Sequence, residues 1–398
     1  MDKQIFQIYL SRGDASSEAY ARLDLPASPW QLLDALDKAR CQDSDSLYLE
    51  IDEYYEYEGL ADILPVLDLP LMELNDLSQR LSNLDARQRI AFEGILRMEL
   101  LKGKEEVTVQ RLRDFTESVD CCHVVPEAKN VYQLGRFYAE NGFVPEVEGV
   151  SEQVFGLLDF YLIGRRMQQE ECGIFTSQGY VVQNDLFKEA PKITEIEPPV
   201  PDYTILLNVS RGIFDNPADD NAQEFLLPLP ASEETLGEVL EALEAASWEE
   251  LSWSCVDCCV PSLTDVITES KDLQSILTIA QLWSAIGLET LPCYKAVLES
   301  TICATLEDAA EIAGHLDAYQ LSPQISSPVE LARTELSTAV PGPLSHVLSS
   351  HVNLNALGRD LLREGNYRLS SYGLIQRWDG QPLQLYRNPE PAHGMELR

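Results

Sequence analysis

The stretch Leu23-Asp-Leu-Pro-Ala-Ser28 returns near the middle of the chain as Leu227-Pro-Leu-Pro-Ala-Ser232. Each copy of this stretch follows a Ser-Arg-Gly tripeptide, at residues 11–13 in the first case and at residues 210–212 in the second. An apolar strand precedes each tripeptide, and apolar residues at helical spacing follow each serine. The two stretches therefore predict the same local structure, a strand pair that leads into a helix.

Further matches follow at a separation that drifts only slowly along the chain. Four residues recur about 197 positions later, namely Asp120, Pro126, Leu134 and Arg136 as Asp317, Pro323, Leu331 and Arg333. Two segments recur about 194 positions later, Gly164-Arg165 as Gly358-Arg359 and residues 177–179 as residues 371–373. A fixed internal period of this kind predicts that one whole unit is duplicated in tandem.

The charge of the chain is strongly negative and evenly divided. The 398 residues include 66 Asp and Glu against 29 Lys and Arg, which gives a formal net charge of −37. Residues 1–200 carry 37 acids and 19 bases, and residues 201–398 carry 29 and 10. Such a surface repels nucleic acid and anionic membranes, so it predicts a basic protein partner.

The composition indicates folded domains in a reducing compartment. At 45% hydrophobic residues the chain has enough apolar side chains for real cores, which argues against a disordered acidic polymer. Its nine cysteines are an odd number, which disfavours a complete disulfide framework. There is no run of 18 apolar residues and no signal-like N-terminus, so we expect a cytoplasmic protein.

The predicted fold class is α+β, with three modules in each unit. The first module has strands at residues 4–11 and 21–25, a helix that begins at Ser28 with Gln31 in a capping box, and a strand at residues 46–52. Helical spacing over residues 71–101 and 107–119 predicts the second module. A helix at residues 154–167 and a hairpin at residues 173–182 complete the unit.

The second unit repeats this order. We expect strands at residues 203–209, 224–229 and 252–260, and helices at residues 232–246, 273–286, 291–298 and 306–316. A helix at residues 354–362 and a hairpin at residues 367–377 follow. The predicted domains are residues 1–190, a proline-rich linker at 191–202, residues 203–380 and a tail at 381–398.

The first unit resembles the ArdA antirestriction proteins in the order of its motifs. They are the leucine-proline helix start, Asp52-Glu53-Tyr54 before an acidic run, Leu74-Asn75, residues 130–138, Leu157-Leu-Asp-Phe160 through Gly164-Arg165, and the hairpin at residues 173–180. The second unit resembles the family more distantly. It keeps Gly358-Arg359 and Tyr372-Gly373 but has Val352-Asn-Leu-Asn355 in place of the Leu-Leu-Asp-Phe segment.

The resemblance implies a mobile-element, anti-defence protein that is not an enzyme and needs no cofactor. ArdA proteins imitate duplex DNA and occupy the DNA-binding groove of type I restriction-modification enzymes. Carried over to this chain, the family-motif contacts are Asp159, Gly164, Arg165, Gly358 and Arg359.

The residues themselves support an acidic binding surface. In residues 232–246, Leu236, Val239, Leu240 and Leu243 form an apolar stripe, while the glutamates lie opposite without alternating lysines. Like charges spaced i,i+4 cost about 0.2–0.5 kcal/mol per pair, so stability alone does not favour this face. The candidate phosphate-mimicking acids are Asp52, Glu53, Glu56, Glu58, Asp62, Glu234, Glu238, Glu241 and Glu244.

The charge also sets a length of DNA that the chain could imitate. Duplex DNA carries one charge per roughly 1.7 Å, so the net charge corresponds to about 18 base pairs. Covering such a footprint requires an elongated molecule with both units on one continuous surface. A homodimer, or an internal pseudo-dimer of the two units, is the corresponding expectation.

Several alternatives stay open. Cys255, Cys258 and Cys259 have zinc-like spacing, with Cys121-Cys122-His123 as a second cluster, although buried reduced thiols are favoured. The acids at residues 52–58 lack the spacing of a calcium loop. Asp159 is either functional or a helix cap, and Arg165-Arg166 either contact a partner or offset nearby carboxylates. No nucleotide-binding or hydrolase motif is present.

Three functions follow from these patterns. The first is a DNA mimic that inhibits a type I restriction-modification enzyme. The second is a decoy for another DNA-binding defence or regulatory protein. The third is an acidic adaptor or immunity protein for a basic partner.

Overall fold

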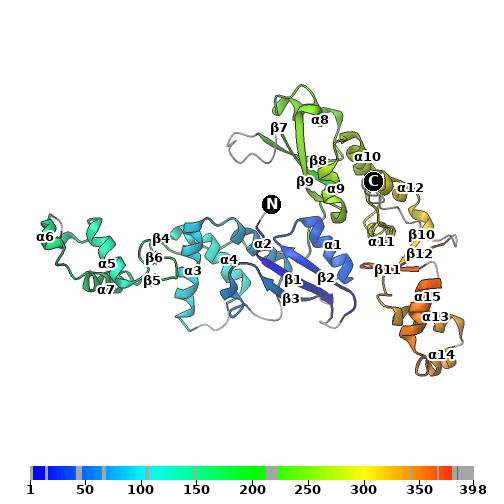
Figure 1. Cartoon of the computed structure of the whole chain (residues 1–398), viewed down its shortest axis with the longest axis horizontal. Coiled ribbons are helices and arrows are strands. Elements are labelled where there is room, and N and C mark those ends of the chain that lie inside the picture. Colours follow the sequence, from blue (N-terminus) through cyan, green and yellow to red (C-terminus); the bar gives the residue numbers. More distant parts are fainter. Residues whose placement is uncertain are drawn as a thin grey trace, which may run out of the picture. The chain divides into compact units, whose positions relative to one another are not determined.

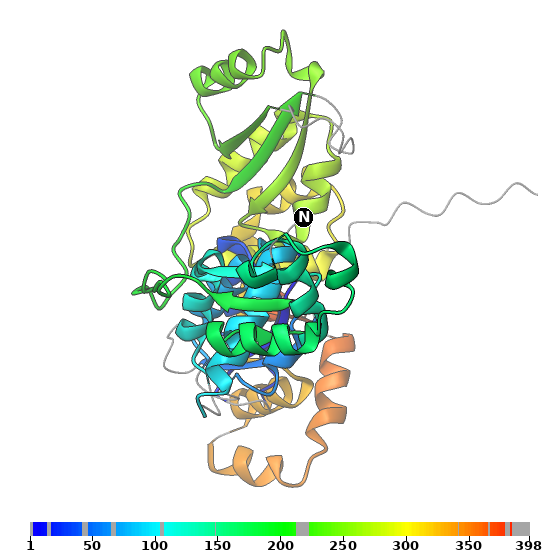
Figure 2. The same cartoon turned by 90° about the vertical axis from the view of Figure 1, so that its left-hand side faces the viewer.

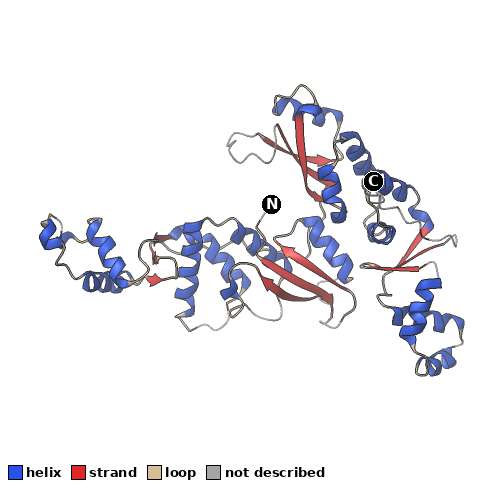
Figure 3. Ribbon diagram, in the orientation of Figure 1, coloured by secondary structure: helices blue, strands red, loops and turns tan. Residues whose placement is uncertain are grey.

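The computed structural model describes residues 3–13, 17–41, 47–64, 69–103, 107–147, 149–211, 223–340, 342–364, 367–378 and 383. Helices alternate with small antiparallel sheets of three strands, which confirms the α+β class (Figure 1 and Figure 3). Within these residues no helix is both long enough and apolar enough to cross a lipid bilayer. Apart from Leu383, the expected tail lies outside the described residues.

Thirteen α-helices and β-strands occupy the described part of the first half. In chain order they are β1 (Phe6–Arg12), β2 (Tyr20–Leu25), α1 (Pro29–Ala39), β3 (Leu47–Tyr54), α2 (Leu71–Ser82), α3 (Ala86–Leu100), α4 (Val109–Glu117), β4 (Cys122–Val125), α5 (Val131–Glu140), α6 (Glu152–Phe155), α7 (Phe160–Glu171), β5 (Ile174–Phe175) and β6 (Tyr180–Gln183). A short 3-10 helix, η2 (Glu58–Leu60), follows β3.

The second half follows a similar order. Its elements are β7 (Ile205–Arg211), β8 (Glu224–Leu229), α8 (Glu233–Ala242), β9 (Leu251–Cys258), η6 (Pro261–Leu263), α9 (Thr264–Glu269), α10 (Leu273–Ala285), α11 (Leu291–Thr301), α12 (Leu306–Gly314), β10 (Tyr319–Ser322), α13 (Pro328–Ala339), α14 (Gly342–Ser349), α15 (Leu354–Glu364), β11 (Tyr367–Ser370) and β12 (Gly373–Arg377).

Two sheet types each occur twice, with the same strand order. The sheets β2-β1-β3 and β8-β7-β9 each place the first strand of their group in the centre. The sheets β4-β6-β5 and β10-β12-β11 each place the last strand in the centre. Figure 2 shows the long green strands of the β8-β7-β9 sheet side by side, as their antiparallel pairing requires.

Helices α1 and α8 begin and end in the same way. The Ser28 side chain accepts a hydrogen bond from the Gln31 N–H, and the Gln31 side chain accepts one from the Ser28 N–H, which confirms the predicted capping box. At α8 the Ser232 side chain accepts from the N–H of Thr235. Just after each helix one residue is left-handed, Arg40 at φ 58° and Glu244 at φ 52°.

Contacts between residues divide the chain into two compact units that do not follow the order of the sequence. The first unit contains residues 1–8, 24–26 and 49–197, and the second contains residues 9–23, 27–48 and 198–398. Helix α1 therefore belongs to the same unit as the second half of the chain. Its packing partners there are β9 and η6.

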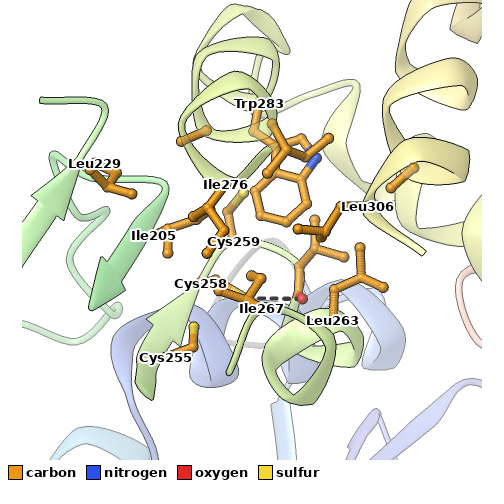
Figure 4. Packing of buried hydrophobic residues seen from close by; sticks show 14 of the residues in the cluster. Ile205, Leu229, Cys255, Cys258, Cys259, Leu263, Ile267, Ile276, Trp283 and Leu306 are labelled. Carbon is orange, nitrogen blue, oxygen red and sulfur yellow. Dashed lines mark hydrogen bonds between the residues drawn. The ribbon is translucent and has the colours of Figure 1, made fainter. Parts of the chain in front are cut away.

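The core of the second unit is built around buried aromatic and branched side chains. Trp283 donates a hydrogen bond to the Tyr294 hydroxyl at 3.0 Å, and that hydroxyl donates to the Ala309 carbonyl at 2.7 Å. Ile205, Ile267 and Ile276 pack in the same cluster (Figure 4). Trp30 of α1 is 4% exposed and joins this cluster, so α1 is part of the core.

Two predicted helical segments are interrupted. The single helix expected over residues 154–167 is wrong, because α6 ends at Phe155 and α7 begins at Phe160. The Asp159 carboxylate accepts hydrogen bonds from the N–H groups of Tyr161 and Leu162, which starts a new helix there. The helical region 71–101 divides in the same manner where Asp85 caps α3.

The proline-rich segment at residues 191–202 contains neither helix nor strand. Its first residue is held by the first unit, since buried Arg113 donates to the Pro191 carbonyl at 2.8 Å. The same guanidinium binds Asp76 at 2.7 Å.

Candidate partner-binding surface

The acidic run that begins at the end of β3 is only partly available for a partner. Asp52, Glu53, Glu58 and Asp62 are exposed. Among the described residues, Glu53, Glu58 and Asp62 form no ion pair. Glu56 differs, because it is half-buried and pairs with Lys3 and with Arg89, the latter at 3.6 Å. Its charge is thus already compensated inside the first unit.

Helix α8 and the turn after it carry the second group of candidate acids, and their positions follow the sequence pattern. Glu234, Glu238, Glu241 and Glu244 are all exposed. On the opposite face Val239 and Leu243 are buried, and Leu236 and Leu240 are partly buried against the same core. The predicted division of the helix into an apolar and an anionic face is confirmed.

The acids of α8 form no ion pair with the residues that the structure describes. Over residues 232–250 the ion pair that forms within the described chain joins Arg211 to Glu250 at 3.7 Å. The other Arg211 contact here is to a backbone oxygen, that of Glu244, at 2.7 Å. The glutamate side chains of α8 itself therefore present uncompensated charge to solvent.

Acids elsewhere in the chain are paired where they stabilise the fold. Asp76 binds Arg80 and Arg113, both at 2.7 Å, and Arg80 also binds Glu117 at 2.8 Å. These contacts tie α2 to α4 in the first unit. The chain does supply arginines where acids join helices, so the lack of an ion pair at the α8 glutamates, among the described residues, is a local property of that surface.

Helix α1 also carries acids, but they are occupied within the second unit. The Lys295 ammonium of α11 lies 2.8 Å from the Asp34 carboxylate and 3.1 Å from that of Asp37. The Tyr372 hydroxyl donates to Asp34 at 2.7 Å, and Lys38 pairs with Asp34 at 2.8 Å. Asp34 and Lys295 are nearly inaccessible, with side chains 6% and 2% exposed.

The environment of this cluster favours the charged forms of Asp34 and Lys295, whereas burial raises the pKa of Asp37. Burial by itself raises the pKa of Asp34, but Lys295 and Lys38 together lower that pKa below its usual value. Burial would likewise lower the pKa of Lys295, whereas Asp34 and Asp37 raise it. Burial and the nearby Asp34 charge raise the pKa of Tyr372, so this hydroxyl remains a donor. At neutral pH the cluster is a buried, hydrogen-bonded ion pair.

A second buried carboxylate, that of Asp257, accepts hydrogen bonds from the N-terminal end of α1. It accepts from the Ser28 hydroxyl at 2.6 Å, from the Trp30 N–H at 3.3 Å and from the Tyr203 hydroxyl at 2.9 Å. Burial raises the pKa of Asp257, and these donors partly offset that rise. A negative charge here also meets the positive end of the helix dipole.

Sequence reasoning missed both buried clusters. Asp34, Asp37 and Lys38 have the spacing of a solvated face, and nothing in the local pattern of residues 291–301 marks Lys295 as buried. The one available signal was Trp30, an aromatic residue in the first turn of α1, close to the capping serine.

The family-motif glycines lie where two helices touch. A Cβ atom on Gly164 of α7 would lie 1.9 Å from the Val131 carbonyl oxygen at the start of α5. A Cβ atom on Gly358 of α15 would lie 1.8 Å from the Pro328 carbonyl oxygen of α13. Both glycines therefore permit a close helix approach, and Asp159 acts as a helix cap in this structure.

The arginines beside these glycines remain exposed. Arg165 and Arg359 form no ion pair with any described residue. Arg166 instead pairs with Glu146 at 3.1 Å and lies 3.8 Å from Glu170. Arg166 thus offsets nearby carboxylates, whereas Arg165 and Arg359 are available to a partner.

The cysteines of the second unit belong to its core. Cys255, Cys258 and Cys259 are buried, and the Cys258 thiol donates to the Val260 carbonyl at 3.0 Å (Figure 4). The hydrogen bond with Cys258, together with burial, raises the pKa of Cys255, and burial raises that of Cys259. Burial also raises the pKa of Cys122 to about 12. Within the described chain, no three His, Cys, Asp or Glu residues group as a metal site requires.

Comparison with known proteins gives no assignment. No model of a known protein family matches the chain, and a search of curated proteins finds no match either. The resemblance to ArdA proteins rests on the sequence motifs alone.

Proposed function

We propose that this protein is a tandem ArdA-like DNA mimic, which binds in the DNA groove of a type I restriction-modification enzyme and inhibits it. The observation that carries the proposal is the exposed, unpaired glutamate face of α8. An ordinary solvated helix mixes both signs of charge, and this face does not. The acids Glu53, Glu58 and Asp62 of the first unit supply a second group of available charges.

The proposed mechanism is occupancy without catalysis. Exposed carboxylates replace DNA phosphates against the lysines and arginines of the groove, and no cofactor takes part. Because the attraction is between charged groups in water, salt weakens it. The protein would act in the cytoplasm, where the restriction enzyme meets DNA.

The proposal includes descent of both halves from one duplicated unit. It is supported by the two matching pairs of sheets and by a repeated contact between a helix and a hairpin turn. The Glu93 carboxylate accepts from the N–H and hydroxyl of Ser177, and the Glu299 carboxylate accepts from the same groups of Ser371. Residues 1–190 and 203–380 are the proposed copies.

The test is a cleavage assay with a purified type I enzyme, unmodified target DNA and the full chain. Inhibition that rises with protein concentration and is relieved by excess duplex DNA is expected. Absence of inhibition would exclude this target. Binding that duplex DNA does not displace would favour an acidic adaptor for a surface outside the groove.

The assay requires the full chain because the boundary between the two copies does not coincide with the boundary between the two compact units. Residues 27–48 of the first copy lie in the second compact unit, and Trp30 is part of its core. A chain that begins after the linker would lack α1, and with it both carboxylates that bind Lys295 and the Ser28 and Trp30 donors to Asp257.

A further inference from the structure

We propose that Cys255 and Cys258 are a redox pair, which hydrogen peroxide converts from two thiols into one disulfide bond. Both residues lie near the C-terminal end of β9, three positions apart. Asp257, which accepts hydrogen bonds from the start of α1, lies between them. The proposal does not depend on the proposed function, because it concerns the chemistry of one strand and the helix that this strand holds.

A bulge in β9 brings both thiols to the same face of the strand. Cys255 lies opposite Leu207 of the neighbouring strand β7. Cys258 lies opposite Ile205, only two residues earlier, so β9 has one extra residue at this place. In a regular strand, residues three positions apart point to opposite faces. The extra residue cancels this alternation, and both cysteines belong to the same buried core.

The two thiols contact each other. A hydrogen bond with Cys258, together with burial, raises the pKa of the Cys255 thiol. Figure 4 shows the two side chains next to each other on β9. The Cys255 thiol also donates to the Asp257 carbonyl at 3.5 Å, and the Cys258 thiol donates to the Val260 carbonyl at 3.0 Å. A disulfide bond needs the sulfur atoms to approach to about 2.0 Å, so its formation must move this end of the strand.

A short helix, α9, packs beside the pair. β9 is an edge strand of its sheet, and the Cys255 N–H donates to the Thr268 hydroxyl of α9 at 3.0 Å. The Cys258 sulfur lies 3.6 Å from the Thr264 hydroxyl of the same helix. Helix α9 has six residues and borders a hollow of about 240 Å³. Because a helix of this length opens locally more easily than a sheet, small uncharged peroxide can reach the thiols.

The reaction balances with peroxide as the only co-reactant. The Cys255 thiol attacks peroxide, becomes a sulfenic acid and releases one water molecule. The Cys258 thiol then attacks the oxidised sulfur, which forms the disulfide and releases a second water molecule. The two sulfur atoms lose two electrons to the peroxide, and both thiol protons end in the water. Because the thiolate is the nucleophile, the raised pKa of Cys255 keeps the reduced pair stable until peroxide is in excess.

The disulfide should loosen the start of α1. Asp257 lies opposite Leu206 of β7, so its side chain points to the other face of β9 from that of Cys258. Its carboxylate accepts from the Ser28 hydroxyl at 2.6 Å and from the Trp30 N–H at 3.3 Å. The disulfide closes a small ring through Asp257. Movement of the strand therefore displaces the carboxylate from both donors.

The experiment treats the reduced full chain with hydrogen peroxide, blocks the remaining thiols with a maleimide and measures the mass of the protein and of its fragments. We expect a disulfide between Cys255 and Cys258 that dithiothreitol reverses. Cys255→Ala and Cys258→Ala should each abolish it. Cys259→Ala removes a buried thiol beside the pair and should leave it unchanged, as the matched control. The exposed thiol of Cys172 shows within the same sample that the reagent has reacted.

Hydrogen exchange of the oxidised and reduced wild type tests the effect on α1. Residues 29–39 should exchange roughly tenfold faster after oxidation, whereas residues 71–82 of α2 should not change. Oxidation of Cys172 without a disulfide in β9 would overturn the redox pair, and this result does not depend on whether any variant folds. A disulfide that persists in Cys258→Ala would overturn it as well. A disulfide that leaves exchange of α1 unchanged would overturn the link to that helix.

Discussion

Acidic residues serve two opposite purposes in this protein, and their surroundings decide which. Asp34 is buried with Lys295 and stabilises the second unit, whereas Glu238, at the matching position of α8, is exposed and uncompensated. A buried ion pair loses much of its attraction to desolvation, but removing one partner leaves an unpaired buried charge. Stability should therefore depend strongly on the integrity of the Asp34–Lys295 pair.

Replacing Lys295→Met should destabilise the second unit by about 3 kcal/mol, because Asp34 would stay buried with less compensation. The double variant Asp34→Asn, Lys295→Met should be less destabilised than the sum of the two single variants. Urea unfolding of all four proteins measures this coupling. Additive losses would show that the pair contributes no specific interaction.

The stabilisation from the Asp34–Lys295 pair should stay constant across neutral pH and should fall at acidic and at alkaline pH. The pKa of Asp34 is lowered, so its contribution is present above its unfolded pKa near 3.8 and is lost as pH falls through the folded value. The pKa of Lys295 is raised, so its contribution is present below its unfolded pKa near 10.5 and is lost as pH rises through the folded value. The measurement is the difference in unfolding free energy between wild type and the double variant from pH 3 to 11. A difference that does not change with pH would contradict the assigned shifts.

Two pairs of helices depend on a glycine at the same place in each half. Helices α5 and α7 meet at Gly164, and α13 and α15 meet at Gly358. The recurrence of Gly-Arg in the sequence marks these positions but does not separate a packing role from a binding role. A side chain at either glycine would collide with a backbone carbonyl oxygen, that of Val131 or that of Pro328, so the close helix packing requires glycine.

Gly164→Ala or Gly358→Ala should destabilise the local helix pair by about 1–3 kcal/mol, because the new methyl group meets backbone atoms that cannot move aside easily. The control is Gly237→Ala on α8, where nothing lies within 4 Å of the added Cβ. That change should stabilise by about 0.5–1 kcal/mol, since alanine favours a helix. Hydrogen exchange of each helix pair measures the effect, and equal responses at all three glycines would refute the packing role.

The sequence predicted helices well where one apolar stripe is buried, and less well where two faces are buried. For α8 the exposed glutamates and the buried leucines follow directly from the spacing. For α1 the spacing marked no acid as buried, although contacts with Lys295 and Tyr372 bury Asp34. Those partners are 261 and 338 residues away in the chain, and no local pattern encodes such a contact.

The net charge of −37 belongs to the whole molecule, but its availability is uneven. In the first unit Asp76, Glu117 and Glu56 form ion pairs. The glutamates of α8 in the second unit form no ion pair with any described residue. Binding should thus depend on a small part of the total charge.

Raising the salt concentration from 50 to 200 mM should weaken binding to the enzyme on the order of tenfold, because mobile ions screen exposed charges. The quadruple variant Glu234→Gln, Glu238→Gln, Glu241→Gln, Glu244→Gln should show a smaller salt dependence as well as weaker binding. Calorimetry at four salt concentrations gives the slope of log Kd against log salt concentration for the wild type and for the variant. Parallel slopes for wild type and variant would show that α8 is not part of the interface.

The amino-acid sequence by itself determined the α+β class, the capping of α1 and the anionic face of α8, but it predicted no element at β4, α5, α13 or α14. These features depend on local spacing and on composition, which can be read over a few turns of chain. Only the tertiary structure decided which acids are free, because burial and pairing depend on residues hundreds of positions apart. It placed α1 of the first half in the core of the second unit, where Lys295 pairs with Asp34 and Asp37. At the matching positions of α8 no such lysine is present in the described structure, and the charge remains available to a partner.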